Sequence, residues 1–145
     1  MILSILNKWK TTQIDFVLAY PQAKNRYDIY MRLPRRIQMG HTTDPHCLKL
    51  QRNLYGGRDA GRTFYLFMTK GLKEIGFNKS AINECVFYRE DTIFFSYVHD
   101  GIIITPSHDI IDLVIGELSK KYDIEDKGDI NEYLGVRDIS ISIRK

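Results

Sequence analysis

Short apolar stretches recur along the chain, some alternating with polar residues and others rich in β-branched and aromatic side chains, and both patterns are typical of β-strands. The first covers residues 11–20, which are rich in β-branched and aromatic side chains, and the second covers residues 27–33. Further strands are predicted over residues 46–57, 84–90, 92–98, 101–105 and 139–143. Gly56 and Gly57 end the third stretch, as expected where a strand gives way to a turn.

Between Asp59 and Ile75 the apolar spacing changes to the three- and four-residue steps of an amphipathic helix. The residues of its apolar stripe are Phe64, Phe67, Met68, Leu72 and Ile75. Gly76 followed by the apolar Phe77 is typical of a helix C-terminus. The sequence therefore predicts a helix over residues 59–75.

A second helix is predicted after Pro106, with Ser107 or Asp109 as its N-cap. The apolar positions expected to be buried on this helix are Ile111, Val114, Ile115, Leu118 and Tyr122. Taken in chain order, the predicted elements are β-β-β-α-β-β-β-α-β. This order indicates an α+β fold, with helices packed on one face of a mainly antiparallel sheet.

The composition is that of one globular domain. Of the 145 residues, 43% are hydrophobic and 27% are charged, and the net charge of +3 permits a polyanionic partner without requiring one. We expect no membrane segment, because no apolar run approaches the ~20 residues that a spanning helix needs. The opening residues lack the pattern of a signal peptide. Cys47 and Cys85 are expected to be reduced, and the location intracellular.

The stretch "IFFSYVHDGIIIT" (93–105) predicts a tight hairpin with His99, Asp100 and Gly101 at its polar break. Asp15 is a second unusual residue, because it lies inside a hydrophobic strand. Alternation places Asp15 with Gln13 and Val17 on one face, and Ile14, Phe16 and Leu18 on the other. Two interpretations stay open: Asp15 points at water, or it is held by a cation. If strand 11–18 pairs beside strand 92–98, Asp15 lies near the hairpin, where clustered carboxylates suit two-metal chemistry.

The chain resembles the reverse transcriptase domain of Ty1/copia-type retrotransposons over almost its whole length. The blocks that carry the resemblance are "TTQIDFVLAYPQA" (11–23), "YDIYMRLP" (27–34), "LKLQRNLYGGRDAGRTFY" (48–65), "GFNKSAINECVFY" (76–88), "YVHDGIIIT" (97–105) and "KKYDIEDKGDINEYLGV" (120–136). Because several blocks occur in the order and approximate spacing of the family, the signal is far more specific than a single short motif.

This resemblance implies a right-hand polymerase palm with part of the fingers. It also implies RNA-templated DNA synthesis with Mg²⁺, deoxynucleoside triphosphates, an RNA template and a DNA primer. Asp15 matches the first catalytic aspartate of the family, and Asp100 matches the second aspartate of its Tyr-x-Asp-Asp turn. Both are therefore implied metal ligands. By the same resemblance, the location is a cytoplasmic particle or the nucleus.

Four further residues are implied to bind substrate. The segment from Leu54 to Arg62 resembles the part of the family that lines the nucleotide and template pocket, which assigns Tyr55, Gly56 and Arg62 to it. Tyr97 precedes the turn and is expected near the primer end.

His99 departs from the family pattern, because it stands where the family has the first aspartate of the turn. An imidazole nitrogen suits softer ions than Mg²⁺. The implied site falls from three carboxylates to two, so we expect little or no polymerase activity from this sequence. In a further hypothesis, a protonated His99 lies between Asp15 and Asp100 and replaces the charge of the metal.

Residues 1–145 are expected to be a partial fingers and palm domain, without the thumb, the RNase H domain or the integrase of a complete polyprotein. An alternative is a non-catalytic remnant that still binds nucleic acid, and another is a remnant with no selected function. The basic residues that suggest nucleic-acid binding are Arg35, Arg36, Lys49, Arg52, Arg58 and Arg62. An ordinary solvated basic surface explains them equally well.

Overall fold

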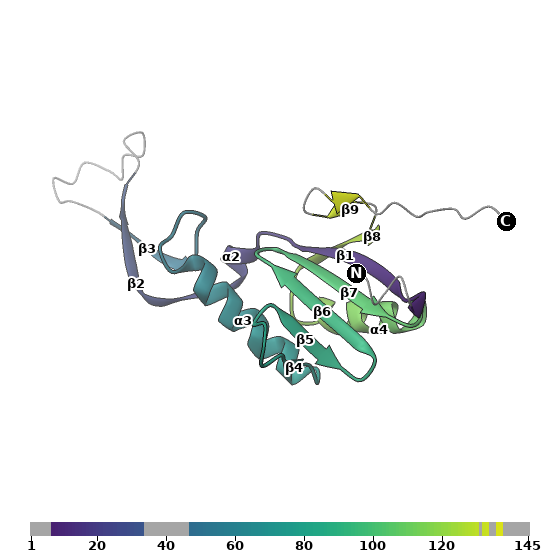
Figure 1. Ribbon diagram of the computed structural model, residues 1–145. Helices are drawn as coiled ribbons and strands as arrows, with labels where there is room; N and C mark the ends of the chain where they lie inside the picture. The colour runs from purple at the N-terminus through teal and green to yellow at the C-terminus, as the bar shows by residue number, and fades with distance from the viewer. Residues whose placement is uncertain (1–6, 34–46, 131, 134–135, 138–145) are drawn as a thin grey trace. The chain divides into compact units, whose positions relative to one another are not determined.

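The protein is described from a computed structural model, which describes residues 7–33, 47–130, 132–133 and 136–137. Figure 1 shows the course of the chain. The chain divides into two compact units, one formed by residues 1–17 and 69–145 and the other by residues 18–68. Each unit is described by itself. The predicted strand over residues 139–143 lies outside the described residues.

The first unit is built on a six-stranded sheet with the order β4-β5-β6-β7-β1-β8. Its strands are β1 (Lys10–Phe16), β4 (Asn78–Lys79), β5 (Val86–Arg89), β6 (Thr92–Tyr97), β7 (Asp100–Thr105) and β8 (Ile124–Asp129). Every pair of neighbouring strands in this sheet is antiparallel. The predicted α+β class with a mainly antiparallel sheet is therefore confirmed.

Two long helices occur at the predicted places. Helix α3 (Ala60–Glu74) begins in the second unit and ends in the first, and helix α4 (His108–Ser119) has Ser107 as its N-cap. Gly76 has a φ of 91°, and the Phe77 amide donates a hydrogen bond of 2.9 Å to the Leu72 carbonyl. This bond spans six residues and closes the end of α3 as the Gly-Phe pair predicts.

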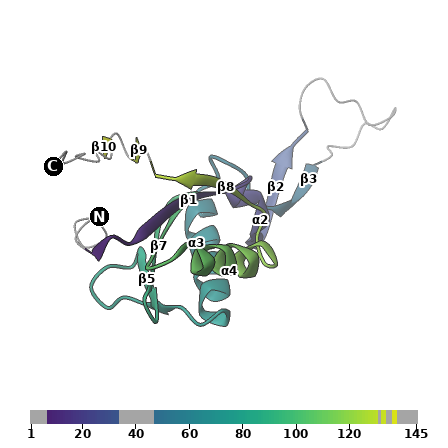
Figure 2. The ribbon, with the colours of Figure 1, turned by 90° about the vertical axis from the view of Figure 1, so that its right-hand side faces the viewer.

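One face of the sheet forms the core of the first unit with α4 and the end of α3 (Figure 2). Strand β1 alternates as expected, with Thr12, Ile14 and Phe16 buried. The rings of Phe16 and Tyr122 pack edge to face with centroids 5.4 Å apart. The other large side chains that are almost fully buried in this core are Leu72, Phe77, Phe87, Phe94, Ile103, Val114 and Leu118. This apolar layer fixes β1 and β7 against the helices.

The opposite face of the sheet carries the intervening positions of each strand. On β1 these are Thr11, Gln13 and Asp15, all partly exposed. A smaller apolar cluster shields part of this face, and its members are Ile102, Ile104 and Ile130, with Trp9, Ile93 and Phe95 packed against them. Asp15 therefore does not lie in the core, and it shares its face with residues of β6 and β7.

The predicted strand over residues 11–20 is too long. Strand β1 ends at Phe16, and residues Ala19–Gln22 form the short helix α2 instead. Leu18 has a left-handed backbone with a φ of 49° and is 63% exposed, so its expected place beside the buried Ile14 and Phe16 is wrong. A side chain cannot keep the strand alternation once its backbone leaves the β region.

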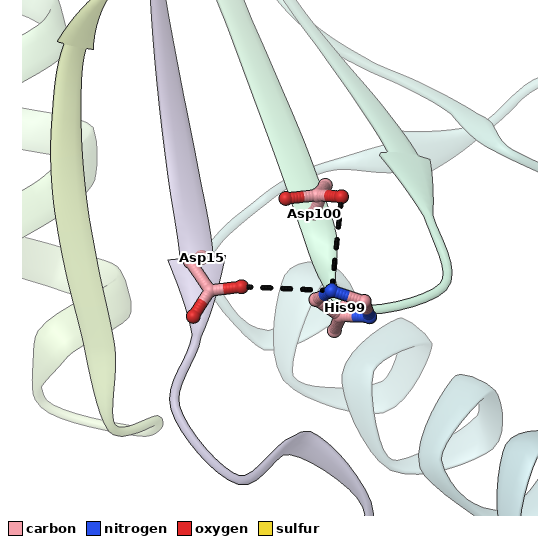
Figure 3. Close-up of side chains that lie close together, drawn as sticks. All are labelled: Asp15, His99 and Asp100. Atoms are coloured by element: carbon pink, nitrogen blue, oxygen red, sulfur yellow. Dashed lines mark ion pairs between the residues drawn. The ribbon is translucent and has the colours of Figure 1, made fainter. Parts of the chain in front are cut away.

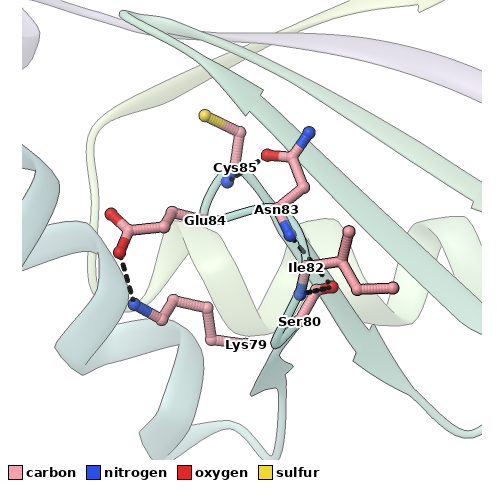
Figure 4. Close-up of polar contacts among 6 residues, drawn as sticks. All are labelled: Lys79, Ser80, Ile82, Asn83, Glu84 and Cys85. Carbon is pink, nitrogen blue, oxygen red and sulfur yellow. Dashed lines mark hydrogen bonds and ion pairs between the residues drawn. The ribbon is translucent and has the colours of Figure 1, made fainter.

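Strands β4 and β5 are joined by a loop that hydrogen bonds within itself (Figure 4). The Ser80 hydroxyl accepts bonds from the Ile82 and Asn83 amides at 3.2 and 3.4 Å. The Asn83 side chain in turn accepts a bond of 2.9 Å from the Cys85 amide. Such side-chain bonds to nearby amides favour turns over regular structure. The predicted strand at residue 84 consequently begins only at Val86.

The second unit contains α2, the first part of α3 and a two-stranded antiparallel ribbon. The ribbon consists of β2 (Lys24–Arg32) and β3 (Cys47–Arg52). Buried Asn53 fastens the base of the ribbon, because its backbone and side-chain amides both donate to the Ala23 carbonyl.

Two further short strands, β9 (Glu132–Tyr133) and β10 (Val136–Arg137), pair with each other. Across the described residues, no helix has the length and apolar character needed to cross a membrane.

Candidate metal centre

Asp15 and Asp100 face each other across two neighbouring strands of the first unit. In the register of β1 with β7, Asp15 is paired directly with Asp100. Strand β1 does not lie beside residues 92–98, the arrangement under which Asp15 would come near the hairpin, because β7 lies between β1 and β6. Asp15 nevertheless lies at the hairpin, since directly paired residues of antiparallel strands project on the same face.

The hairpin between β6 and β7 has a shorter loop than predicted. Tyr97 pairs with Asp100, so the loop consists of Val98 and His99 alone, and Asp100 and Gly101 belong to β7. Two-residue hairpins need a positive φ at the first loop position, and Val98 has a φ of 56°. A positive φ is a true outlier for a β-branched residue. Backbone strain of this kind occurs mainly at functional sites.

His99 is held with its imidazole toward both carboxylates (Figure 3). The Phe16 amide donates a hydrogen bond of 2.8 Å to the His99 carbonyl, which fastens the loop to the end of β1. The imidazole Nε2 lies 4.0 Å from the Asp15 Oδ1 and 3.9 Å from the Asp100 Oδ2. One potential ligand atom from each of the three residues lies within 4.8 Å of the other two.

The carboxylates are partly shielded from solvent and have polar neighbours. The side chains of Asp15 and Asp100 are 26% and 24% exposed, against 48% for His99. Gln13 donates a hydrogen bond of 3.2 Å from its Nε2 to the Asp100 Oδ1. This bond orients the Asp100 carboxylate, because a hydrogen-bond donor fixes one of its two oxygens.

Sequence reasoning missed strand β8, which adds a third carboxylate and a cation on the other side of β1. Glu125 is paired directly with Asp15, and Lys127 forms an ion pair of 2.6 Å with Glu125. The hydrogen bond to Glu125 raises the pKa of Lys127, and the charges of Glu125, Asp15 and Asp100 raise it further. No alternation of apolar residues marks β8, so its sequence gives no strand signal.

Gly101 is needed for packing rather than for a turn. A Cβ atom at this position would lie 2.7 Å from Phe94 Cζ and 2.9 Å from Ile14 Cγ1. Both neighbours are completely buried. A glycine next to Asp100 therefore lets β7 lie close to the core while the aspartate projects on the opposite face.

The structure brings together four of the predicted site residues: Asp15, Tyr97, His99 and Asp100. Tyr97 is paired with Asp100 and is 48% exposed. The other three predicted residues belong to the second unit, where Gly56 has a φ of 83° and Arg62 is exposed. Tyr55 packs there against Tyr20 with ring centroids 4.7 Å apart. The substrate-binding role of all four, including Tyr97, stays a prediction.

The donor set does not match Mg²⁺. This ion takes oxygen ligands in near-octahedral geometry, and Asp15 and Asp100 offer such oxygens. The third donor beside these two carboxylates is the imidazole nitrogen of His99, which suits transition-metal ions. The three residues therefore form a mixed nitrogen and oxygen site.

A family model described as reverse transcriptase (RNA-dependent DNA polymerase) matches residues 1–143 of the chain. The chain belongs to this family. As a reverse transcriptase domain, it is 27% identical over 130 residues to the retrovirus-related Pol polyprotein from transposon TNT 1-94 of Nicotiana tabacum, covering 86% of this chain and 10% of that protein. The corresponding protein from transposon RE1 of Arabidopsis thaliana is 26% identical over 132 residues, covering 88% of this chain and 9% of that protein.

The truncated transposon Ty1-A Gag-Pol polyprotein of Saccharomyces cerevisiae is 26% identical over 122 residues, covering 83% of this chain and 10% of that protein. The chain is thus a reverse transcriptase domain of the Ty1/copia type, and it spans about a tenth of the length of these relatives. No solved structure matches the chain.

Proposed function

We propose that the chain is part of the palm, with part of the fingers, of an RNA-directed DNA polymerase, and that Asp15 and Asp100 derive from its two-metal site. The observation that carries this proposal is the direct pairing of Asp15 with Asp100 beside a two-residue hairpin loop. Two carboxylates from separate strands then meet on one face of the sheet, as metal-assisted phosphoryl transfer requires.

His99 makes this site a poor one for polymerisation with Mg²⁺. Phosphoryl transfer depends almost entirely on positioning and on neutralising the charge of the phosphates. A group that contributes no negative charge occupies the position next to Asp100. Removing one preorganised group from an active site typically costs about 10²–10³ in rate, so we expect at least this loss relative to an all-carboxylate site.

Primer extension on an RNA template tests the proposal. The chain and a control variant, Asp15→Asn with Asp100→Asn, are assayed with Mg²⁺ and deoxynucleoside triphosphates. We expect the chain to give no more product than the control. Robust synthesis that disappears in the control variant would overturn the claim that His99 disables the site.

A second candidate function is nucleic-acid binding, and the distribution of charge favours it. Residues 18–68 contain nine basic and three acidic residues, a net charge of +6, whereas the other unit contains twelve and fifteen, a net charge of −3. Within the second unit, Tyr27 and Tyr30 on the ribbon are 62% and 58% exposed. Arg26 lies 5.8 Å from the Tyr27 ring centroid, and Lys49 lies 6.0 Å from that of Tyr30. Exposed aromatic rings beside cations are typical of surfaces that bind single-stranded nucleic acid.

Salt-dependent binding to an RNA strand and to an RNA–DNA duplex measures this function. Two double variants are compared. The ribbon variant combines Lys24→Gln and Lys49→Gln, and the control variant combines Lys70→Gln and Lys73→Gln on α3, which removes the same charge outside the second unit. We expect the ribbon variant alone to reduce the slope of log K against log salt, by up to about 1.8 on the duplex and about 1.4 on the single strand if both lysines contact phosphates. An equal effect of the two variants would show that only net charge matters.

A further inference from the structure

We propose that Asp15, His99 and Asp100 bind a transition-metal ion of the Zn²⁺ or Co²⁺ type in preference to Mg²⁺. The inference deepens the proposed function and rests on it only in treating these residues as a metal site. It concerns binding rather than synthesis, so it can be tested in a protein that polymerises nothing.

The distances between the donor atoms are compatible with one shared ion. Metal bonds to imidazole nitrogen and carboxylate oxygen are about 2.0–2.2 Å long, so two donors of one tetrahedral ion lie about 3.3–3.6 Å apart. The Nε2 of His99 lies 4.0 Å from the Asp15 oxygen and 3.9 Å from the Asp100 oxygen. Each carboxylate oxygen must therefore come about 0.3–0.7 Å closer to the Nε2 to share an ion with it, and all three side chains are partly exposed.

The chemistry of the three donors favours a borderline ion over a hard one. Imidazole binds Zn²⁺, Co²⁺ and related ions well, and at a given site these ions bind more tightly than Mn²⁺. Mg²⁺ gains little from a nitrogen ligand, and it usually keeps several bound waters because it loses them reluctantly. With His99 as the third donor, the site loses a charge that Mg²⁺ needs and gains a ligand that Zn²⁺ and Co²⁺ use.

Neighbouring groups hold the donors in place. Gln13 donates to the Asp100 carboxylate and so orients one of the three donors, and the Phe16 amide binds the His99 carbonyl and so fastens the backbone of the loop that carries the imidazole. Donors oriented in this way bind a metal better than unsupported ones, because their neighbours fix ligand direction. Lys127 opposes binding of any cation, since the charges of Asp15 and Asp100 both act on its ammonium group.

Co²⁺ is the probe, because its visible absorption reports the ligands bound to it. The protein is titrated with Co²⁺, and the bound Co²⁺ is then challenged with Zn²⁺ or with a large excess of Mg²⁺. We expect one Co²⁺ per chain, displaced by Zn²⁺ and retained against Mg²⁺. Displacement of Co²⁺ by Mg²⁺ at comparable concentration would overturn the preference.

Three variants assign the binding to the site. His99→Gln removes the nitrogen ligand and is expected to weaken Co²⁺ binding by about tenfold or more. Mutating a residue that only hydrogen bonds to a metal ligand already costs about this much affinity. His108→Gln removes an exposed histidine at the start of α4 and is expected to change nothing. His99→Asp is expected to lose Co²⁺ affinity and to gain Mg²⁺ affinity. Equal Co²⁺ binding by the protein and His99→Gln would overturn the proposal.

A second readout needs no variant. Paramagnetic Co²⁺ should broaden the imidazole resonances of His99 in NMR spectra at ratios that leave those of His108 sharp. Equal broadening of both would indicate scattered surface binding and contradict the site. If primer extension with Mg²⁺ succeeds while Co²⁺ binding behaves as expected, the proposed impairment fails and the metal preference stands. The reverse pattern would reject the metal preference alone.

Discussion

Replacing Gly101 with alanine tests how closely strand β7 packs on the core beside Asp100. The new methyl group would lie 2.7 Å from Phe94 Cζ and 2.9 Å from Ile14 Cγ1. Phe94 has no room to turn aside, because Phe77 and Phe87 pack against it with ring centroids 6.1 and 6.3 Å away. Either the ring or strand β7 must therefore move.

Two opposing effects decide the size of the change. Forcing an extra methyl group into a packed core costs about 1–3 kcal/mol. Alanine in place of glycine lowers the entropy of the unfolded chain, which stabilises the fold by about 0.4–1 kcal/mol. The two ranges differ by about 0–2.6 kcal/mol, and the two short contacts favour the upper part, so we expect Gly101→Ala to lower the free energy of unfolding by about 1–2 kcal/mol.

Urea unfolding followed by circular dichroism measures this change, and Gly116→Ala is the matched control. A Cβ atom at Gly116 on helix α4 meets nothing within 4 Å. That variant should raise stability by about 1 kcal/mol, the difference between alanine and glycine in a helix. If Gly101→Ala were as stable as the unchanged protein, strand β7 would not approach Phe94 and Ile14 as closely as the structure has it.

Four other substitutions have expected outcomes. Gly71→Ala should lower stability in urea by about 1–3 kcal/mol despite its better helix propensity, because the new Cβ would lie 1.8 Å from the Tyr122 hydroxyl oxygen; a gain would contradict the packing. Burial, and then the charge of Glu74, raises the pKa of Tyr122 above its usual value of 10.0. The contribution of the Tyr122 hydroxyl to stability is therefore complete below pH 10 and declines as the pH rises further, because the unfolded chain loses this proton first. Tyr122→Phe should flatten the alkaline decline in stability, which this residue steepens by up to ~1.4 kcal/mol per pH unit; an unchanged slope would contradict the assignment. Val98→Gly should stabilise the hairpin by about 1 kcal/mol in thermal unfolding, since glycine adopts a positive φ without strain. A lower stability would mean that packing of the Val98 side chain outweighs its backbone strain. Lys127→Gln should raise Co²⁺ affinity in calorimetric titration, and an unchanged affinity would show that its charge does not reach the carboxylates.

The parts of the fold that sequence patterns predicted are those with a strong apolar period. Helix α3 differs from its prediction by one residue at each end, because an apolar stripe and the Gly76–Phe77 end signal agree. Strands β6 and β7 were predicted nearly to their ends, since both carry long β-branched and aromatic runs. Local signals and tertiary packing favour the same structure in these segments.

The site was predicted as a set of residues but not as a geometry. Family resemblance singled out Asp15, His99 and Asp100, yet the sequence left the partner strand of Asp15 open, because strand order depends on contacts between distant segments. Strand β8 was missed, since five of its six residues are charged or glycine and its order comes from pairing with β1. Glu125 and Lys127 could therefore be found beside the site only from the structure.

We propose that His99 stands in a polymerase site in place of a needed carboxylate. The most direct test joins this domain to the remaining segments of the tobacco Pol polyprotein and measures primer extension on an RNA template with Mg²⁺. Two forms are compared, one with His99 and one with His99→Asp. We expect synthesis only by the His99→Asp form, and its loss when Asp15→Asn is added. Equal synthesis by both forms would show that His99 does not disable the site.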